Sequence, residues 1–137
     1  MAWHPDWLKA YYRSEVWAKR RKAYYRRHKR QCAACGTWKR VQLHHVEYEG
    51  PWGNLRNRFD WGKEPDRALL PLCGKNGLRQ GCHGNVHRLE KQVNDLRRAT
   101  EEIVSKGRAR QWRRKQLRRL GKWVRRQMWS TPGVKSA

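Results

Sequence analysis

Four cysteines constrain the fold of this chain more than any other feature, because they form two glycine-flanked pairs. The pairs are Cys32 with Cys35, which have two residues between them, and Cys73 with Cys82, which have eight residues between them. Thiolates that close tight turns can present their sulfurs to one zinc ion, and two such turns complete a tetrahedron. The second gap is wide, but Gly74, Gly77 and Gly81 let that loop fold back. The pattern predicts a structural zinc with four protein ligands.

A metal of this kind would compensate for a thin apolar core. The chain has 137 residues, enough for one domain or a small domain with an extension. Leu, Ile, Val and Phe together number 21, a low share that is typical of disorder when the net charge is high. Nine Trp and five Tyr can bury large apolar areas, and a bound metal can stabilise what the core does not. We therefore expect a small, metal-stapled, basic protein that folds.

The first residues lack a basic start followed by an apolar stretch, and no apolar run approaches 18 residues. We expect no secretory signal, no transmembrane helix and a cytoplasmic protein. Thiols stay reduced in that compartment, so the cysteines are interpreted as metal ligands and not as disulfides.

The charge of the chain indicates a polyanionic partner. Lys and Arg number 34 against 11 Asp and Glu, which gives a formal charge of +23. This excludes an ordinary neutral enzyme and makes a polyanion, such as a nucleic acid, the default partner. Ser14 is a plausible N-cap for a helix over 15–28, with an aromatic stripe at Trp17, Tyr24 and His28. Its other face carries four candidate DNA contacts, which are Arg20, Arg21, Arg26 and Arg27.

The rest of the chain alternates short structured segments with turns. Residues 1–12 are expected to form an arm, 41–46 a short strand, 47–66 a long loop and 69–72 an apolar stretch. A helix is expected from Gly84, with one apolar face made of Val86, Leu89, Val93, Leu96 and Ile103. Gly107 is expected to break this pattern, and the tail after Ser130 is expected to be disordered.

A second basic helix is expected over 106–129, where eleven Lys and Arg occur without an acid. Three of its residues are candidate DNA contacts, namely Arg113, Arg114 and Arg118. Trp112, Trp123 and Trp129 could stack on bases, but at helical spacing we expect them to pack on the domain. An amphipathic basic helix could also bind a membrane surface, an interpretation that we do not favour.

Two histidine pairs suggest a second metal site. His44 and His45 are adjacent on a predicted strand, so their side chains point to opposite faces, and one can bind metal while the other faces a substrate. His83 and His87 are four residues apart on a predicted helix, which places both imidazoles on one face. The simpler alternative is that His83 and His87 form a solvated helix edge and that His44 is a core residue. The interleaving of the histidine pairs with the cysteine pairs disfavours this alternative.

The ordered set of cysteines and histidines, Cys32-x2-Cys35, His44-His45, Cys73 and Cys82-His83-x3-His87, resembles the HNH endonucleases over about residues 11–90. The resemblance implies an α+β fold, with a small ββα-metal (His-Me finger) core stapled by a four-cysteine zinc and flanking N- and C-terminal helices. It implies a nuclease domain over 1–105 that includes the N-terminal basic helix, followed by a basic amphipathic helix and flexible tail over 106–137.

The family's site roles can be carried over by position. The resemblance implies that His44, His83 and His87 bind a catalytic divalent cation, and that His45 is the general base that activates water. Mg²⁺, Mn²⁺, Ni²⁺ and Zn²⁺ all remain open as that cation. The family's central asparagine, which steadies the base-bearing loop, falls on Ala68 here. Asn54, Asn57 and Asp66 are candidates to replace it.

The leading expectation is a metal-dependent endonuclease that nicks or cuts duplex DNA. Similar small HNH proteins occur in phages, which implies a bacterial host cytoplasm and a role with the phage terminase in genome packaging, although homing and restriction are equally compatible. The second expectation is a zinc-stapled nucleic-acid-binding protein with weak or lost catalysis. The third is an RNA-binding protein of a ribonucleoprotein.

Overall fold

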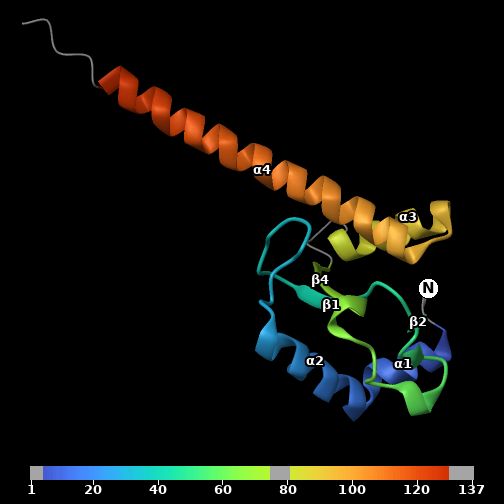
Figure 1. The fold of residues 1–137 in the computed structure, drawn as a ribbon. Coiled ribbons are helices and arrows are strands. Elements are labelled where there is room, and N and C mark those ends of the chain that lie inside the picture. Colours follow the sequence, from blue (N-terminus) through green and yellow to red (C-terminus); the bar gives the residue numbers. More distant parts are fainter. Residues whose placement is uncertain (1–4, 75–80, 130–137) are drawn as a thin grey trace, which may run out of the picture.

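The computed structural model describes residues 5–74 and 81–129. In these residues a two-stranded antiparallel sheet lies between two helical layers, with α1 and α2 on one side and α3 and α4 on the other (Figure 1). A second two-stranded sheet is formed inside the segment between β1 and β4. The expected α+β class is confirmed.

Two helices form the first layer, α1 over Asp6–Arg13 and α2 over Glu15–Arg27. The Ser14 side chain accepts a hydrogen bond from the Trp17 amide at 3.2 Å, so the expected N-cap and helix are confirmed. The expected N-terminal arm is wrong from Asp6 onward. Leu8 and Tyr11 are fully buried, and that burial makes the segment a helix packed on the domain.

The central hairpin joins β1, Val41–His45, to β4, Leu69–Cys73. In its register His44 lies opposite Leu70 and His45 opposite Leu69. The segment expected to be only a loop contains β2, Glu49–Gly50, paired with β3, Gly53–Asn54, and two 3-10 turns, η1 over Arg58–Asp60 and η2 over Asp66–Ala68.

Two helices form the second layer, α3 over Cys82–Val93 and α4 over Leu96–Trp129. The single apolar face that we expected is divided between them. Asn94 adopts a left-handed conformation with φ of 52°, and the Asp95 carboxylate accepts from the Arg98 amide at 2.9 Å, which ends one helix and begins the next. Val93 and Leu96 therefore lie on different helices of one cluster.

Gly107 lies inside α4 and does not end it, contrary to expectation. A Cβ at this position would lie 2.4 Å from the carbonyl oxygen of Ala34, so the missing side chain lets the first cysteine turn approach the helix backbone. Gln111, one turn later, donates a hydrogen bond to the same carbonyl. α4 also runs without interruption across the expected domain boundary at 105/106.

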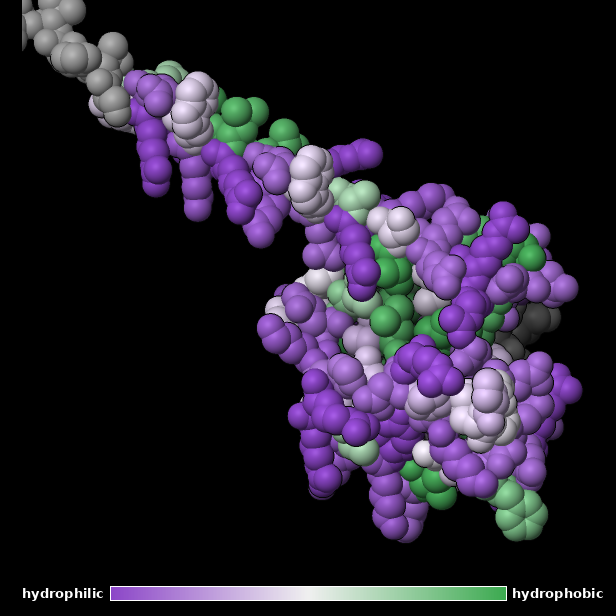
Figure 2. All heavy atoms as spheres, viewed as in Figure 1, coloured by the Kyte–Doolittle hydropathy of each residue, from purple (hydrophilic) through white to green (hydrophobic). Residues whose placement is uncertain are grey.

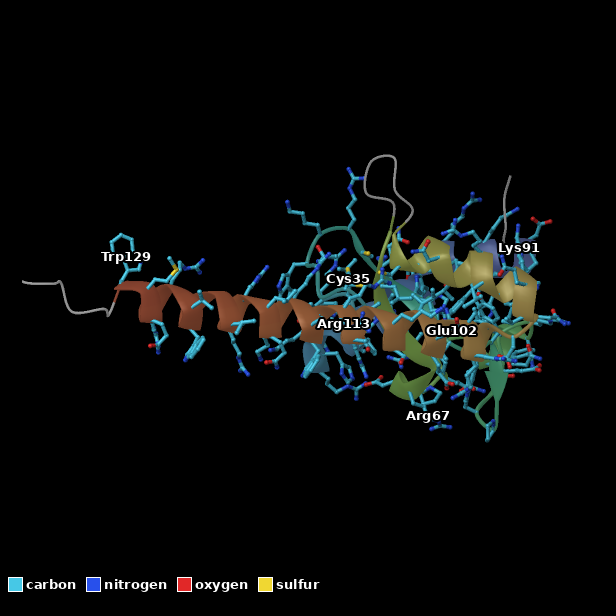
Figure 3. The ribbon with its side chains drawn as sticks, turned by 90° about the horizontal axis from the view of Figure 1, so that it is seen from above. Cys35, Arg67, Lys91, Glu102, Arg113 and Trp129 are labelled. Atoms are coloured by element: carbon cyan, nitrogen blue, oxygen red, sulfur yellow. The ribbon has the colours of Figure 1, made fainter. Side chains whose placement is uncertain are left out.

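Beyond this contact α4 projects from the domain (Figures 1 and 3). The expectation that its tryptophans pack on the domain is wrong, since Trp112, Trp123 and Trp129 are 64%, 59% and 88% exposed. Figure 2 shows hydrophilic side chains along one edge of the projecting helix and hydrophobic ones along the other. Each helix in the described part of the chain is too short or too polar to cross a bilayer. The expected disordered tail lies outside the described residues.

Candidate metal centres

The four cysteine sulfurs meet between the hairpin and the second helical layer. Their Sγ atoms all lie within 4.8 Å of one another, with Cys35 and Cys73 3.7 Å apart. Cys32 and Cys35 come from the turn before β1, Cys73 ends β4, and Cys82 begins α3. This arrangement can hold a metal ion such as zinc.

Local backbone geometry brings the second cysteine pair together. A Cβ on Gly81 would lie 1.8 Å from the carbonyl oxygen of Gly74, so only glycine allows the two ends of the loop to approach this closely. The expected glycine-dependent return of the chain is confirmed at Gly81, whereas a Cβ on Gly74 would meet only the side chain of Gln42, at 3.2 Å. Gly77 lies outside the described residues.

The thiols perturb one another strongly. A hydrogen bond with Cys82 lowers the pKa of Cys32 to about 4, whereas burial raises the pKa of Cys35 to about 11. The hydrogen bond with Cys32 raises the pKa of Cys82 far above its usual value. Four ionised sulfurs would therefore repel one another here, and a cation is the group that would let all four ionise.

Three histidines form a second cluster beside the first. His44 on β1 is 1% exposed, and His83 and His87 project from α3 toward it. Ring nitrogens of the three lie within 4.8 Å of one another, and the two Nε2 atoms of His83 and His87 are 3.1 Å apart. The structure brings together the three residues expected as ligands of a divalent cation.

Each of these rings is held by a hydrogen bond at one nitrogen. Nδ1 of His87 lies 2.9 Å from the carboxylate of Glu90, and Nδ1 of His83 lies 3.0 Å from Oε1 of Gln42. Each of these oxygens accepts a hydrogen bond, which assigns N–H to Nδ1 and leaves Nε2 as the ligand atom.

His44 is held by Thr100 of α4. Nε2 of His44 lies 3.1 Å from Oγ1 of Thr100, and this hydroxyl donates to the Leu96 carbonyl at 2.7 Å. The hydroxyl proton is thus used, so Oγ1 accepts from Nε2–H and Nδ1 of His44 becomes the ligand atom. Anchoring of this kind is typical of metal-binding histidines.

His45 is not brought to this cluster. Its ring is 0% exposed on the opposite face of β1, packed on Tyr11, Tyr12 and Trp17. Burial lowers its pKa, which favours the neutral form of the ring. Nε2 lies 3.4 Å from Glu64 and Nδ1 lies 3.1 Å from the Tyr12 hydroxyl. The expectation that His45 faces a substrate is therefore wrong in this conformation, because no surface of the ring is accessible.

Glu64 is a residue that sequence reasoning missed. Its side chain is 0% exposed and accepts hydrogen bonds from His45 and from the Tyr11 hydroxyl. Burial opposes its ionisation, yet these hydrogen bonds hold the pKa of Glu64 below its usual value. A glutamate in a turn-rich segment carries no sequence signal of burial, because its partners are 19 and 53 residues away.

The candidates for the missing asparagine are all engaged outside the histidine cluster. Asn54 donates to Glu49, Asn57 caps η1, and Asp66 accepts from Arg20. The loop after His45 is held by backbone instead, because the Val46 amide donates to the Ala68 carbonyl at 2.8 Å.

The expected DNA contacts differ in accessibility. The Arg20 side chain is 9% exposed and donates to the Glu64 carbonyl and to Asp66, so it is a structural residue and the expectation is wrong. Arg27 also pairs with Asp66, but it stays 63% exposed. The other five are exposed on α2 and on the projecting part of α4, namely Arg21, Arg26, Arg113, Arg114 and Arg118.

Comparison of the chain with protein-family models, with curated proteins and with solved structures finds no match. The functional argument therefore depends on the geometry of the two clusters and on the charge around them.

Proposed function

We propose that this protein is a metal-dependent endonuclease that hydrolyses phosphodiester bonds in DNA. One observation carries the proposal: three imidazoles from two elements converge, and each is held at its second nitrogen by Gln42, Glu90 or Thr100. On a chain of charge +23, a cation at such a site would meet phosphate before any other abundant ligand.

The four cysteines have a separate role in this proposal. A site with four protein ligands has no open position, so zinc held by the cysteines would be structural. It would fix the turn before β1 and the start of α3, the elements beside the three histidines. In this proposal the β1–β4 hairpin followed by α3 would correspond to the ββα-metal core that the HNH resemblance implies.

The three histidines leave coordination positions open for water and phosphate. A divalent ion bound there would stabilise charge on the phosphate oxygens and make a bound water more acidic. His44, His83 and His87 would hold it, while exposed cations such as Arg21 and Arg26 would bind the phosphates on either side. Because His45 is buried, this proposal assigns water activation to the metal ion, and the His45–Glu64 pair acts as a positioning element behind the strand.

Plasmid cleavage tests this proposal. Supercoiled plasmid is incubated with the zinc-loaded full chain and Mg²⁺, Mn²⁺ or Ni²⁺, and nicked and linear products are resolved on a gel. We expect cleavage that depends on the added cation and is abolished in His87→Ala. His28→Ala is the matched control, because His28 is 42% exposed and pairs with Asp66 outside the cluster. Cleavage by His87→Ala at the wild-type rate would overturn the proposal.

His45→Gln separates two routes to water activation. A folded His45→Gln protein that still cleaves supports activation by the metal ion alone. A folded protein with wild-type metal affinity and no cleavage would instead return His45 to the role of general base.

The buried His45 also favours a second candidate function, a zinc-stapled DNA-binding protein without catalysis. It predicts tight duplex binding, one retained zinc per chain and intact plasmid with every divalent cation. The same gel distinguishes the two functions.

A further inference from the structure

A groove lies between α2 and β1 and reaches the histidine cluster. Its volume is about 740 Å³, within the range of roughly 300–1,000 Å³ that is usual for small-molecule sites. Aromatic rings of Trp17 and Tyr25 form part of its wall, as do the cationic side chains of Arg21, Lys22 and Arg30. Among the described residues, no acidic side chain lines it.

This lining matches the two parts of a nucleotide. Arg21, Lys22 and Arg30 offer charge to a phosphate, and the aromatic rings offer a surface on which a base can stack. A pocket for an acidic peptide would need the cations but not the rings, and one for an apolar ligand would need the rings but not the cations. Together they favour nucleic acid.

Tyr25 provides an independent sign that a ligand is expected here. Its Oη atom is buried and has no hydrogen-bond partner among the described residues. Burying a hydroxyl without a partner is unfavourable, and an oxygen or ring nitrogen of a ligand would accept from it. The Arg30 guanidinium lies 5.7 Å from the centre of the Tyr25 ring and is held by the Val41 carbonyl at 3.3 Å, so these two side chains are arranged together.

His83 connects the groove to the proposed reaction site. It lines the groove and is also one of the three clustered histidines. A strand whose phosphate reaches the histidines would therefore place a neighbouring nucleotide in the groove. A base held in a duplex cannot enter, because its faces are covered by its stacking neighbours.

We infer that the α2–β1 groove binds one unpaired nucleotide of a DNA strand, next to the phosphodiester held at the histidine cluster. This inference rests on the proposed function for the position of the phosphate. It makes single-stranded or locally opened DNA the preferred substrate of the protein.

Fluorescence of 2-aminopurine tests the groove separately from cleavage. A single-stranded oligonucleotide with one 2-aminopurine is titrated with the zinc-loaded full chain without added divalent cation, and the same oligonucleotide in duplex form is titrated in parallel. We expect stacking to quench the single strand on binding, with weaker binding of the duplex. Tyr25→Leu should lower the affinity for the single strand by about 5- to 150-fold, the range for loss of one stacked base.

Matched variants control this experiment. Phe59→Leu removes an aromatic ring that is 84% exposed outside the groove, and it should bind like the wild type. Arg21→Gln changes an exposed groove residue without touching the core, so it tests the groove should Tyr25→Leu fail to fold. Equal binding of single strand and duplex, with no loss in Arg21→Gln or in folded Tyr25→Leu, would overturn the inference.

The outcomes also separate the groove from the catalytic proposal. Quenching that depends on Tyr25, in a protein that cleaves nothing, supports the groove and contradicts the endonuclease. Cation-dependent cleavage with unchanged binding in both groove variants supports the endonuclease and contradicts the groove.

Discussion

At the scale of single residues, hydrogen bonds from outside the histidine cluster decide what its rings can do. Thr100 illustrates this, because its hydroxyl donates to Leu96 and therefore accepts from His44. The hydrogen bond ties α4 to β1 at the proposed catalytic site. No spacing rule in the sequence connects residues 44 and 100, so this partner could not be predicted, whereas the grouping of His44, His83 and His87 could.

Thr100→Val removes that acceptor while preserving the shape of the side chain. We expect the affinity of the histidine cluster for Ni²⁺ to fall by about 10- to 100-fold, as is usual when such a partner is removed. Isothermal titration of the zinc-loaded protein measures the affinity. Ser105→Ala, an exposed hydroxyl deletion on the same helix, is the control. Unchanged affinity in Thr100→Val would show that the hydrogen bond does not orient His44.

Glu64 should make stability depend on pH. Its pKa is held below the usual value of 4.5 despite burial, so the folded state binds fewer protons than the unfolded state in mildly acidic solution. The stabilisation is present above about pH 4.5 and is lost as the pH falls through the folded-state pKa.

Glu64→Gln keeps the shape of the side chain but removes its charge. We expect it to cost about 1.5–3 kcal/mol at pH 7, the usual worth of hydrogen bonds to a charged group, and less as the pH falls toward about 3. Urea unfolding at several pH values measures the difference. A difference that does not change with pH would mean that folding leaves the pKa of Glu64 unchanged.

At the scale of elements, the backbone of the first cysteine turn packs closely against α4 at one of its two glycines. Both Gly107 and Gly121 lie in this helix, and a sequence alone gives no reason to treat them differently. At Gly107 an added Cβ would meet the Ala34 carbonyl, whereas at Gly121 the nearest atom is the flexible end of Arg125 at 3.9 Å. The expected helix break at Gly107 failed for this reason.

The pair offers a matched test. Gly107→Ala should destabilise the protein by about 1–3 kcal/mol through the forced displacement of the cysteine turn. Gly121→Ala should stabilise the helix by about 0.5–1 kcal/mol, because alanine loses less backbone freedom. Chemical unfolding of both variants measures this. Effects of the same sign and size would contradict the packing of Ala34 on α4.

Local sequence patterns predict some of these elements correctly and miss others. α2 and its Ser14 cap follow from local sequence, and so does β1. The turn at Asn94 was missed because Val93 and Leu96 share an apolar face whether the helix continues or reverses. Arg20 is buried because it pairs with Asp66, which is distant in the sequence. Trp112 is exposed because no distant segment among the described residues covers it.

At the scale of the whole molecule, Cys32, Cys73 and Cys82 lie in or against the apolar cluster that joins the β1–β4 hairpin to α3 and α4, so zinc bound by the four cysteines would tie these elements together. Removal of zinc by a chelator should therefore unfold the hairpin layer, with loss of the far-ultraviolet circular dichroism signal in step with metal release. A colorimetric zinc assay and circular dichroism on the same sample measure both. Release of zinc with an unchanged spectrum would show that the metal is not structural.

The charge of the projecting helix should govern the salt dependence of DNA binding. Replacing Arg113, Arg114 and Arg118 by Gln should reduce the slope of log K against log salt by about 0.9 for each phosphate that these side chains neutralise. Fluorescence anisotropy with a labelled duplex between about 50 and 200 mM salt measures the slope. Arg56→Gln, an exposed change outside α4, is the control. An unchanged slope in the triple variant would exclude this helix from the interface.

The projecting part of α4, 112–129, extends the molecule on one side of the domain only. At about 1.5 Å per residue it extends about 27 Å beyond the domain, the length of roughly eight stacked base pairs. The DNA footprint of the protein should therefore be asymmetric about the cleavage site. Cleavage should lie near one end of the protected region, and the projecting helix should protect the DNA toward the other end. Such a protein would bind DNA with a defined orientation relative to the cut. Two copies that face each other across one cut would have their projecting α4 segments directed away from each other along the DNA.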